Sequence, residues 1–273
     1  MAGKLGILAG AGALPFKLVE VCRSQGRDVF VLAFEGQTDP RTMEDVEHAW
    51  IRLGAAASGI KLLTDAGVGE VVMAGAVERP SLTELRPDLS TTRWLARMGA
   101  ASLGDDGLLS GIIRTLEAEG FTVLGVDELL MDLVAEAGIY GKVSPDEQAR
   151  RDIERGVAVA RRLGEQDVGQ AVVVQQGLVL AVEAIEGTDA LLARAGELRR
   201  EGPGGVLVKV KKPQQEERAD LPSIGPRTVA GARAAGLIGI AIEAGGGLVI
   251  DRGRMVEAAD AAGLFLIGLA LDP

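Results

Sequence analysis

Short apolar runs that alternate with amphipathic stretches are the feature that most limits what this chain can fold into. Strands are predicted at residues 4–10, 28–34, 70–75 and 121–126, and helices around residues 14–16, 59–63 and 108–116. A strand–helix alternation of this kind favours a parallel sheet covered by helices. The pattern therefore predicts a parallel α/β fold for the first half of the chain.

The second half follows a different pattern. Residues 138–143 lose the strand–helix rhythm and are predicted to be a linker. After them, Ser144, Pro145 and Glu147 form a capping-box pattern that predicts the start of a helix. Further strands are predicted at 170–174, 178–182, 205–210, 238–242, 248–250 and 265–269. The first pair reads as a hairpin, so the second sheet is expected to be mixed. The expected domains are a Rossmann-like parallel α/β domain over 1–137 and a second α/β domain over 144–273.

Composition narrows the classes of function. The chain carries 29 Lys and Arg against 39 Asp and Glu, and this net charge of -10 does not suit a nonspecific nucleic-acid binder. The single cysteine, Cys22, is expected to be buried, and the single histidine, His48, is expected at an exposed strand edge. A multi-histidine zinc site is therefore excluded. No stretch approaches the roughly 20 apolar residues of a membrane span, so we expect a cytoplasmic protein with peripheral membrane contact only.

A glycine-rich turn follows the first predicted strand. Gly10 and Gly12 lie there, and glycine lets backbone N–H groups approach an anion at a helix N-terminus. Glu35 stands where a dinucleotide-binding fold places its ribose-binding acid, but Pro15 replaces the third glycine of that fingerprint. A structural turn and a ligand loop both fit Gly10 and Gly12, and an NAD site fits less well.

Two other motifs of the first half have a functional and a structural interpretation. Gly75 and Arg79 follow a predicted strand, where glycine permits close backbone approach and arginine pairs with anions. A loop with solvated charges fits these two residues equally well. Asp105 and Asp106 precede a predicted helix, whose dipole acids complement. As metal ligands they give a weak signal, because the side chains of adjacent residues diverge.

The connector over residues 211–228 gathers cations, amides and one carboxylate beyond the end of a predicted strand. Ligands of open α/β sheets bind in the crevice at the carboxyl ends of strands, and prolines stiffen this connector as a preorganised site requires. Such a group suits phosphate charge, whereas the alternative is a solvated charged loop. The candidate substrate-binding residues here are Lys211, Lys212, Gln214, Arg218, Arg227 and Thr228, and the candidate catalytic acid is Asp220.

Three more carboxylates surround a predicted strand–helix turn. Glu183 ends an otherwise apolar strand, and Glu186 and Asp189 come before the helix. Magnesium takes one or two carboxylates together with water and phosphate oxygens. From charge and spacing we predict that Glu183, Glu186 and Asp189, together with Asp220, hold a metal. The alternative is that Thr188 or Asp189 caps the helix while both glutamates are solvated.

Several runs of residues together resemble a known family: Asp167–Gln170, Val179–Asp189, Lys212–Pro226, Gly6–Pro15, Met73–Pro80, Gly104–Asp106 and Glu117–Phe121. They look like the corresponding runs of the LpxI-type UDP-2,3-diacylglucosamine pyrophosphatases of lipid A biosynthesis. Ser223 stands where a threonine is common. The resemblance implies two α/β domains that hold a lipid product between them. It also implies magnesium-dependent hydrolysis of the nucleotide-sugar lipid to UMP and 2,3-diacylglucosamine 1-phosphate (lipid X), with Asp220 as the catalytic aspartate.

The resemblance and the chemistry set further expectations. The substrate is an acylated nucleotide sugar, the metal is Mg²⁺ or Mn²⁺, and nucleic acid is not a partner. Two acyl chains require an aliphatic cleft, expected between residues 1–137 and 144–273, and transient contact with the cytoplasmic face of the inner membrane. The subunit number stays open, and a homo-oligomer is compatible with the sequence. Two alternatives are an NAD- or nucleotide-binding oxidoreductase and a non-enzymatic lipid-binding protein.

Overall fold

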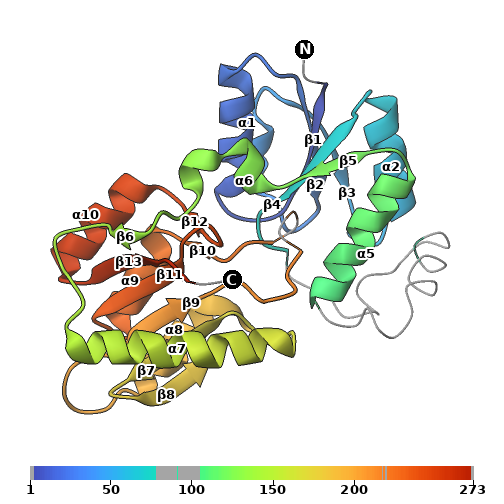
Figure 1. Ribbon diagram of the computed structural model, residues 1–273. Coiled ribbons are helices and arrows are strands. Elements are labelled where there is room, and N and C mark those ends of the chain that lie inside the picture. The colour runs from blue at the N-terminus through green and yellow to red at the C-terminus, as the bar shows by residue number, and fades with distance from the viewer. Residues whose placement is uncertain (1–2, 78–90, 92–104, 217, 219, 272–273) are drawn as a thin grey trace. The chain divides into compact units, whose positions relative to one another are not determined.

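The computed structural model describes residues 3–77, 91, 105–216, 218 and 220–271, and the chain forms two compact units (Figure 1). The first unit comprises residues 1–131 together with the short segment 216–220, and the second comprises 132–215 and 221–273. The first unit therefore ends at Met131, apart from the segment 216–220, while the domain limits 1–137 and 144–273 stay a prediction. The segment that carries Asp220 groups with the first unit, although both of its flanks belong to the second.

The first unit is built on a five-stranded sheet in the order β3-β2-β1-β4-β5. Its strands are β1 (Leu5–Ala9), β2 (Val29–Phe34), β3 (Glu47–Ile51), β4 (Glu70–Ala74) and β5 (Thr122–Leu124). Every pairing is parallel. This order matches the first five strands of a dinucleotide-binding sheet. In such a sheet all strands are parallel, and the order in which strands are added reverses between β1 and β4. The predicted Rossmann-like parallel domain is confirmed.

Helices cover both faces of this sheet (Figure 1). Helix α1 (Leu14–Ser24) lies on one side, and α2 (Ala56–Asp65) and α5 (Asp105–Ala118) lie on the other. Short helical turns are η1 (Pro40–Met43) and α6 (Val126–Leu129), and η3 (Met131–Leu133) follows at the unit boundary. Successive strand side chains point to opposite faces, so Leu8 and Phe30 pack in the core that contains Leu63 of α2.

The second unit is built on a six-stranded sheet in the order β6-β13-β11-β9-β7-β8. Its strands are β6 (Gly138–Ile139), β7 (Ala171–Gln175), β8 (Leu178–Val182), β9 (Val206–Lys209), β11 (Gly239–Glu243) and β13 (Phe265–Leu269). The three strands β9, β11 and β13 run parallel, and the others pair antiparallel, so the predicted mixed sheet is confirmed. The edge strand β6 lies inside the predicted linker, where its backbone pairs with β13.

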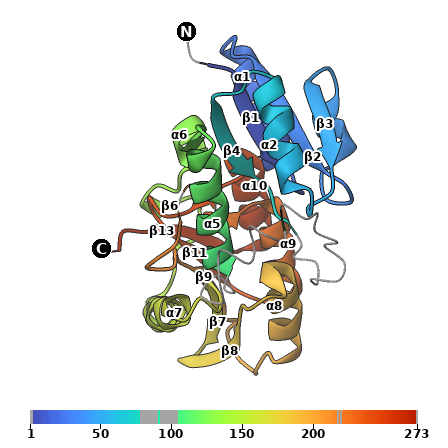
Figure 2. The same ribbon diagram turned by 90° about the vertical axis from the view of Figure 1, so that its right-hand side faces the viewer.

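Helix α7 (Glu147–Glu165) covers one face of the second sheet, and α8 (Gly187–Glu197), α9 (Pro226–Ala234) and α10 (Arg252–Ala262) cover the other (Figure 2). The N-cap of α7 is Asp146, not Ser144, because the Asp146 carboxylate accepts a hydrogen bond of 2.7 Å from the Ala149 N–H. The short strands β10 (Ser223–Ile224) and β12 (Leu248–Val249) pair with each other outside the main sheet. Sequence analysis predicted a strand at residues 248–250 but not this pairing.

The two single-copy residues lie where the sequence places them. Cys22 is buried in α1, and burial raises the pKa of its thiol. His48 is exposed on the edge strand β3 and contacts the Val46 carbonyl through Nδ1. Among the helices of the described residues, none has the length and apolarity that crossing a membrane requires.

A buried aspartate joins α7 to the β7–β8 hairpin. The Asp152 carboxylate is 1% exposed and accepts hydrogen bonds of 2.8 Å from the Gln176 N–H and 2.7 Å from the Gly177 N–H. Gln176 has a φ of 53°, in the left-handed region. The carboxylate therefore satisfies the two turn amides and fixes the hairpin on the helix.

We predict that Asp152→Ala lowers the free energy of unfolding by about 1–3 kcal/mol, because two turn N–H groups lose a charged acceptor. Urea unfolding of the purified variant measures this change. The matched control is Glu154→Ala, an exposed acid on the same helix, which should change stability by no more than about 0.5 kcal/mol. Equal stabilities of the two variants would contradict the role assigned to Asp152.

Candidate functional site

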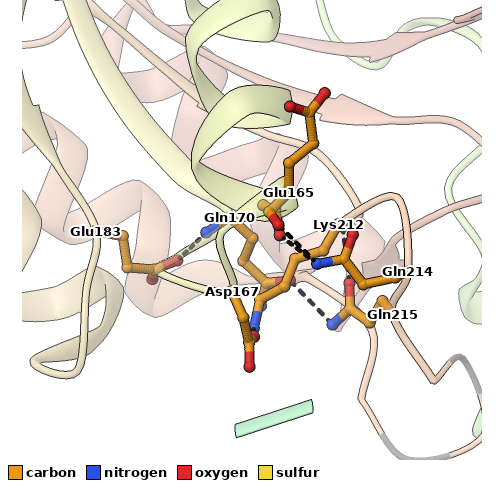
Figure 3. A network of polar contacts seen from close by, with 8 residues as sticks. Glu165, Asp167, Gln170, Glu183, Lys212, Gln214 and Gln215 are labelled. Atoms are coloured by element: carbon orange, nitrogen blue, oxygen red, sulfur yellow. Dashed lines mark hydrogen bonds and ion pairs between the residues drawn. The ribbon is translucent and has the colours of Figure 1, made fainter. Parts of the chain in front are cut away.

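Polar contacts of buried side chains fix the first part of the connector, residues 211–215, which precedes Asp220 (Figure 3). We call these residues the first stem. Lys212 Nζ pairs with Asp167 Oδ1 at 2.6 Å, and the Lys212 backbone N–H donates to Gln215 Oε1 at 3.0 Å. The Gln215 amide in turn donates to Gln170 Oε1 at 3.1 Å. Lys212 and Gln215 are both buried. The predicted substrate-binding residue Lys212 is therefore already opposed by a carboxylate within the second unit.

Two neighbours of Lys212 also hold the first stem. The Gln214 amide nitrogen donates to the carbonyls of Gly164 and Glu165 at 2.8 and 3.2 Å, and so contacts the C-terminal end of α7. The Lys211 backbone N–H donates to Glu243 Oε2 at 2.7 Å. Gln214 was predicted to bind substrate, and in the structure its amide contacts helix α7.

The second stem, residues 221–225, follows Asp220 and is held by a buried lysine that sequence analysis missed. Lys209, the last residue of β9, is 4% exposed, and its Nζ donates to Thr188 Oγ1 at 2.8 Å and to the Ser223 carbonyl at 3.2 Å. The Thr188 hydroxyl donates to Glu183 Oε1, and Glu183 Oε2 accepts from the Gln170 N–H at 3.3 Å. The sequence signal was a lysine ending a strand of Val and Leu, the same pattern that drew attention to Glu183.

The segment between the stems belongs to the first unit. Within it the Asp220 N–H donates to the Glu216 carbonyl at 3.2 Å. Arg218 pairs with Glu216 at 2.8 Å and with Glu117 of α5 at 2.6 Å. These two carboxylates raise the pKa of the Arg218 guanidinium, and its hydrogen bond lowers the pKa of Glu216. Arg218, a predicted phosphate-binding cation, thus carries two acidic partners.

The predicted metal ligands of the second unit do not gather around one point. Glu186 pairs with Arg194, Asp189 pairs with Arg227, and Glu183 accepts from Thr188 and Gln170. Within the part of the chain that the structure describes, no group of three or more His, Cys, Asp or Glu is arranged to hold a metal ion. The expected grouping of Glu183, Glu186 and Asp189 around one ion is therefore not formed.

The helix caps also differ from the alternative interpretation. Glu186 is the N-cap of α8 and caps without a side-chain hydrogen bond, while the Thr188 hydroxyl is used on Glu183. Thr228, a predicted substrate-binding residue, instead accepts from the Gly225 N–H at 3.2 Å and caps α9. Arg227 contacts Asp189 in an exposed ion pair.

The two glycine turns of the first unit pack against each other. The Gly10 N–H donates to the Ala74 carbonyl at 2.8 Å, and Ala11 and Ala76 form an antiparallel bridge. A Cβ on Gly10 would lie 2.5 Å from the Ala76 oxygen, and one on Gly75, whose φ is 90°, would lie 2.4 Å from the Ala11 oxygen. These glycines are thus required by the close approach of two loops, and no ligand is needed to explain them.

The remaining predicted residues of the first unit are separate cases. Gly12 has a φ of 93°, and a Cβ at this position would meet nothing within 4 Å, so a left-handed turn explains the glycine. Arg79 lies outside the described residues. Asp105 and Asp106 open α5, as the helix-dipole interpretation predicts.

The second unit has a groove beside helix α7. It has a volume of about 540 Å³ between α7 and the end of β13, with Ile153, Val157 and Leu269 among its apolar lining residues and Arg150 and Arg161 beside them. None of the predicted site residues lines it. The predicted cleft for acyl chains stays a prediction.

Comparisons with known proteins place the chain in one family from end to end. A family model described as the LpxI N-terminal domain matches residues 4–133, and one described as the LpxI C-terminal domain matches residues 136–267. A protein of Caulobacter vibrioides named UDP-2,3-diacylglucosamine pyrophosphatase LpxI is 42% identical over 277 residues. The alignment covers 99% of this chain and 98% of that protein.

Solved structures resemble the chain only remotely. CobK precorrin-6A reductase has a TM-score of 0.36 at 15% identity, and the match covers 100% of this chain and 90% of that one. The biotin carboxylase domain of a thermophilic 2-oxoglutarate carboxylase has a TM-score of 0.27 at 14% identity, covering 63% of this chain and 35% of that one. At these TM-scores neither likeness bears on fold or function.

We predict that Gly10→Ala lowers the free energy of unfolding by about 1–3 kcal/mol, because the added methyl group collides with the Gly75 and Ala76 carbonyls. Chemical denaturation measures the loss. Gly69→Ala is the matched control, since a Cβ there meets nothing within 4 Å. A Gly10→Ala variant of unchanged stability that fails only in ligand binding would restore the ligand-loop interpretation.

Proposed function

The chain belongs to the LpxI family, and we propose that it hydrolyses UDP-2,3-diacylglucosamine to UMP and 2,3-diacylglucosamine 1-phosphate (lipid X) in lipid A biosynthesis. The observation that carries this proposal is the match to the Caulobacter protein of that name over nearly the full length of both chains. The fixed stems on both sides of Asp220 support it, because hydrolysis requires a rigidly placed catalytic group.

The substrate sets the chemical task. A diphosphate carries dense negative charge, which repels an incoming water molecule, and the water must be aligned with the leaving phosphate. We assign Asp220 to orienting or deprotonating this water, or to holding the ion that positions it. The cations and amides of the connector, with Gly10, Gly12, Gly75 and Arg79, stay the predicted substrate-binding set.

Magnesium, or manganese in its place, is part of the proposal. The carboxylates of Glu183, Glu186 and Asp189 already have hydrogen-bond or ion-pair partners, so they do not fit a preformed set of ligands around one metal ion. The donor set fits a cation that is bound largely by the diphosphate, since Mg²⁺ usually combines one or two carboxylates with substrate phosphates. Asp220 would be its protein ligand. Such a cation neutralises phosphate charge and polarises the leaving group.

The acyl chains bear on location. We propose that the enzyme acts in the cytoplasm and meets the inner membrane transiently, because its substrate carries two long apolar chains that reside there. An aliphatic surface for these chains belongs to the same proposal. A homo-oligomer stays compatible with it.

We predict that Asp220→Asn reduces kcat by at least about 1,000-fold, because the amide neither accepts a proton from water nor neutralises a cation. UMP release from the diacylated nucleotide sugar measures turnover, and circular dichroism with binding of the intact substrate checks that the variant folds. Asp65→Asn makes the same chemical change at an ion pair on the exposed side of α2 and should leave kcat unaltered. Turnover by Asp220→Asn at the wild-type rate would reject the assignment.

We predict that UMP release stops in EDTA and returns with added Mg²⁺ or Mn²⁺, because a divalent cation balances the diphosphate charge. Full activity in the chelator would exclude the metal.

Titration with NAD and with UMP separates the hydrolase from the oxidoreductase alternative. Tight NAD binding without a response to UMP would favour an oxidoreductase. Bound acylated sugar phosphate without UMP release in any metal would favour a lipid-binding protein.

A further inference from the structure

A single chain of hydrogen bonds ties together the two stems of the Asp220 connector. At one end Lys209 Nζ holds the Ser223 carbonyl, three residues after Asp220. Thr188 and Glu183 continue the chain to Gln170, whose side chain accepts from Gln215 on the first stem. Figure 3 shows Gln170 in the middle of this path, between Glu183 and Gln215.

Two buried charges, those of Lys209 and Glu183, explain why this series of hydrogen bonds forms. Lys209 and Glu183 are 4% and 6% exposed, and Lys209 Nζ donates to a hydroxyl and to a backbone carbonyl. A buried charge without compensation costs several kcal/mol, so the ammonium requires a counter-charge. The Thr188 hydroxyl accepts from Lys209 and donates to Glu183, which makes it a bridge between a buried cation and a buried anion.

We propose that Lys209, Thr188 and Glu183 form a positioning relay for Asp220, and that Glu183 serves as the counter-charge of Lys209 rather than as a metal ligand. The relay contacts the backbone of the connector and no reacting atom, so its members are positioning residues. Its effect is expected on kcat, because a displacement of about 1 Å at a reacting group can cost about 100-fold in rate. This inference rests on the proposed hydrolase function for its kinetic readout only.

The bridge allows a sharp substitution pair. Thr188→Val keeps the shape of the side chain but removes both hydrogen bonds, whereas Thr188→Ser keeps the hydroxyl. We expect Thr188→Val to lower kcat at least about 10-fold with KM changed less than about 3-fold, and Thr188→Ser to stay within about 3-fold of the wild type in both. Lys209→Met should reproduce the kinetic pattern of Thr188→Val.

A second readout does not depend on activity. Hydrogen exchange of the amides over residues 221–225 and 211–216 should accelerate in Thr188→Val and stay unchanged in Thr188→Ser. The matched control is Gln175→Leu, which removes a fully buried amide whose hydrogen bonds, among the described residues, go to the Arg200 and Pro203 backbone. This variant should lose stability without altering kcat or the exchange of the connector.

The outcomes separate the two proposals. If the wild type releases no UMP, the hydrolase function fails, and the exchange measurements alone decide the relay. Wild-type kcat in Thr188→Val, or unchanged exchange of the connector in that variant, would overturn the relay. It would also be overturned if Thr188→Ser were as impaired as Thr188→Val, because the hydroxyl would then not be the group that matters.

Discussion

A lysine ammonium buried at the end of β9 is the constraint on which the arrangement of the candidate site depends. Such a charge persists in a sheet only where hydrogen bonds and an opposite charge replace the lost water. Here Thr188 supplies the hydroxyl and Glu183 the charge, while the Ser223 carbonyl takes another donor. These hydrogen bonds therefore join three elements that are distant in sequence, α8, β9 and β10. The connector that carries Asp220 begins and ends on these elements.

The first unit shows how a dinucleotide-type sheet can serve without a dinucleotide site. In that fold the ligand occupies the crevice where strand order reverses, which here lies between β1 and β4. The loops that follow these strands are instead joined by the Ala11–Ala76 bridge, and Gly10 and Gly75 make this contact sterically feasible. The glycines that suggest a cofactor fingerprint are thus accounted for by backbone packing. This observation weighs against the oxidoreductase alternative.

Local pattern was enough to predict most of the fold. The run at residues 265–269 coincides with β13, and the hairpin at 170–182 coincides closely with β7 and β8. The misses have a common cause. Strand β6 has two residues and exists because β13 offers an unpaired edge, and the pairing of β12 with β10 depends on contacts between distant residues. Such pairings are set by tertiary structure, which apolar periodicity does not report.

The site was harder to predict because sequence shows charges but not their partners. In the sequence Lys212 and Arg227 are both cations of the connector, but in the structure they differ in how exposed their ion pairs are. The Lys212 side chain is 7% exposed and its Nζ pairs with Asp167 Oδ1 at 2.6 Å, so a phosphate that binds Lys212 competes with an existing carboxylate partner. Arg227 is 84% exposed in its pair with Asp189, and such a pair contributes only about 0–1 kcal/mol. A diphosphate would therefore displace less of the existing structure at Arg227 than at Lys212, and both residues stay predicted substrate-binding residues.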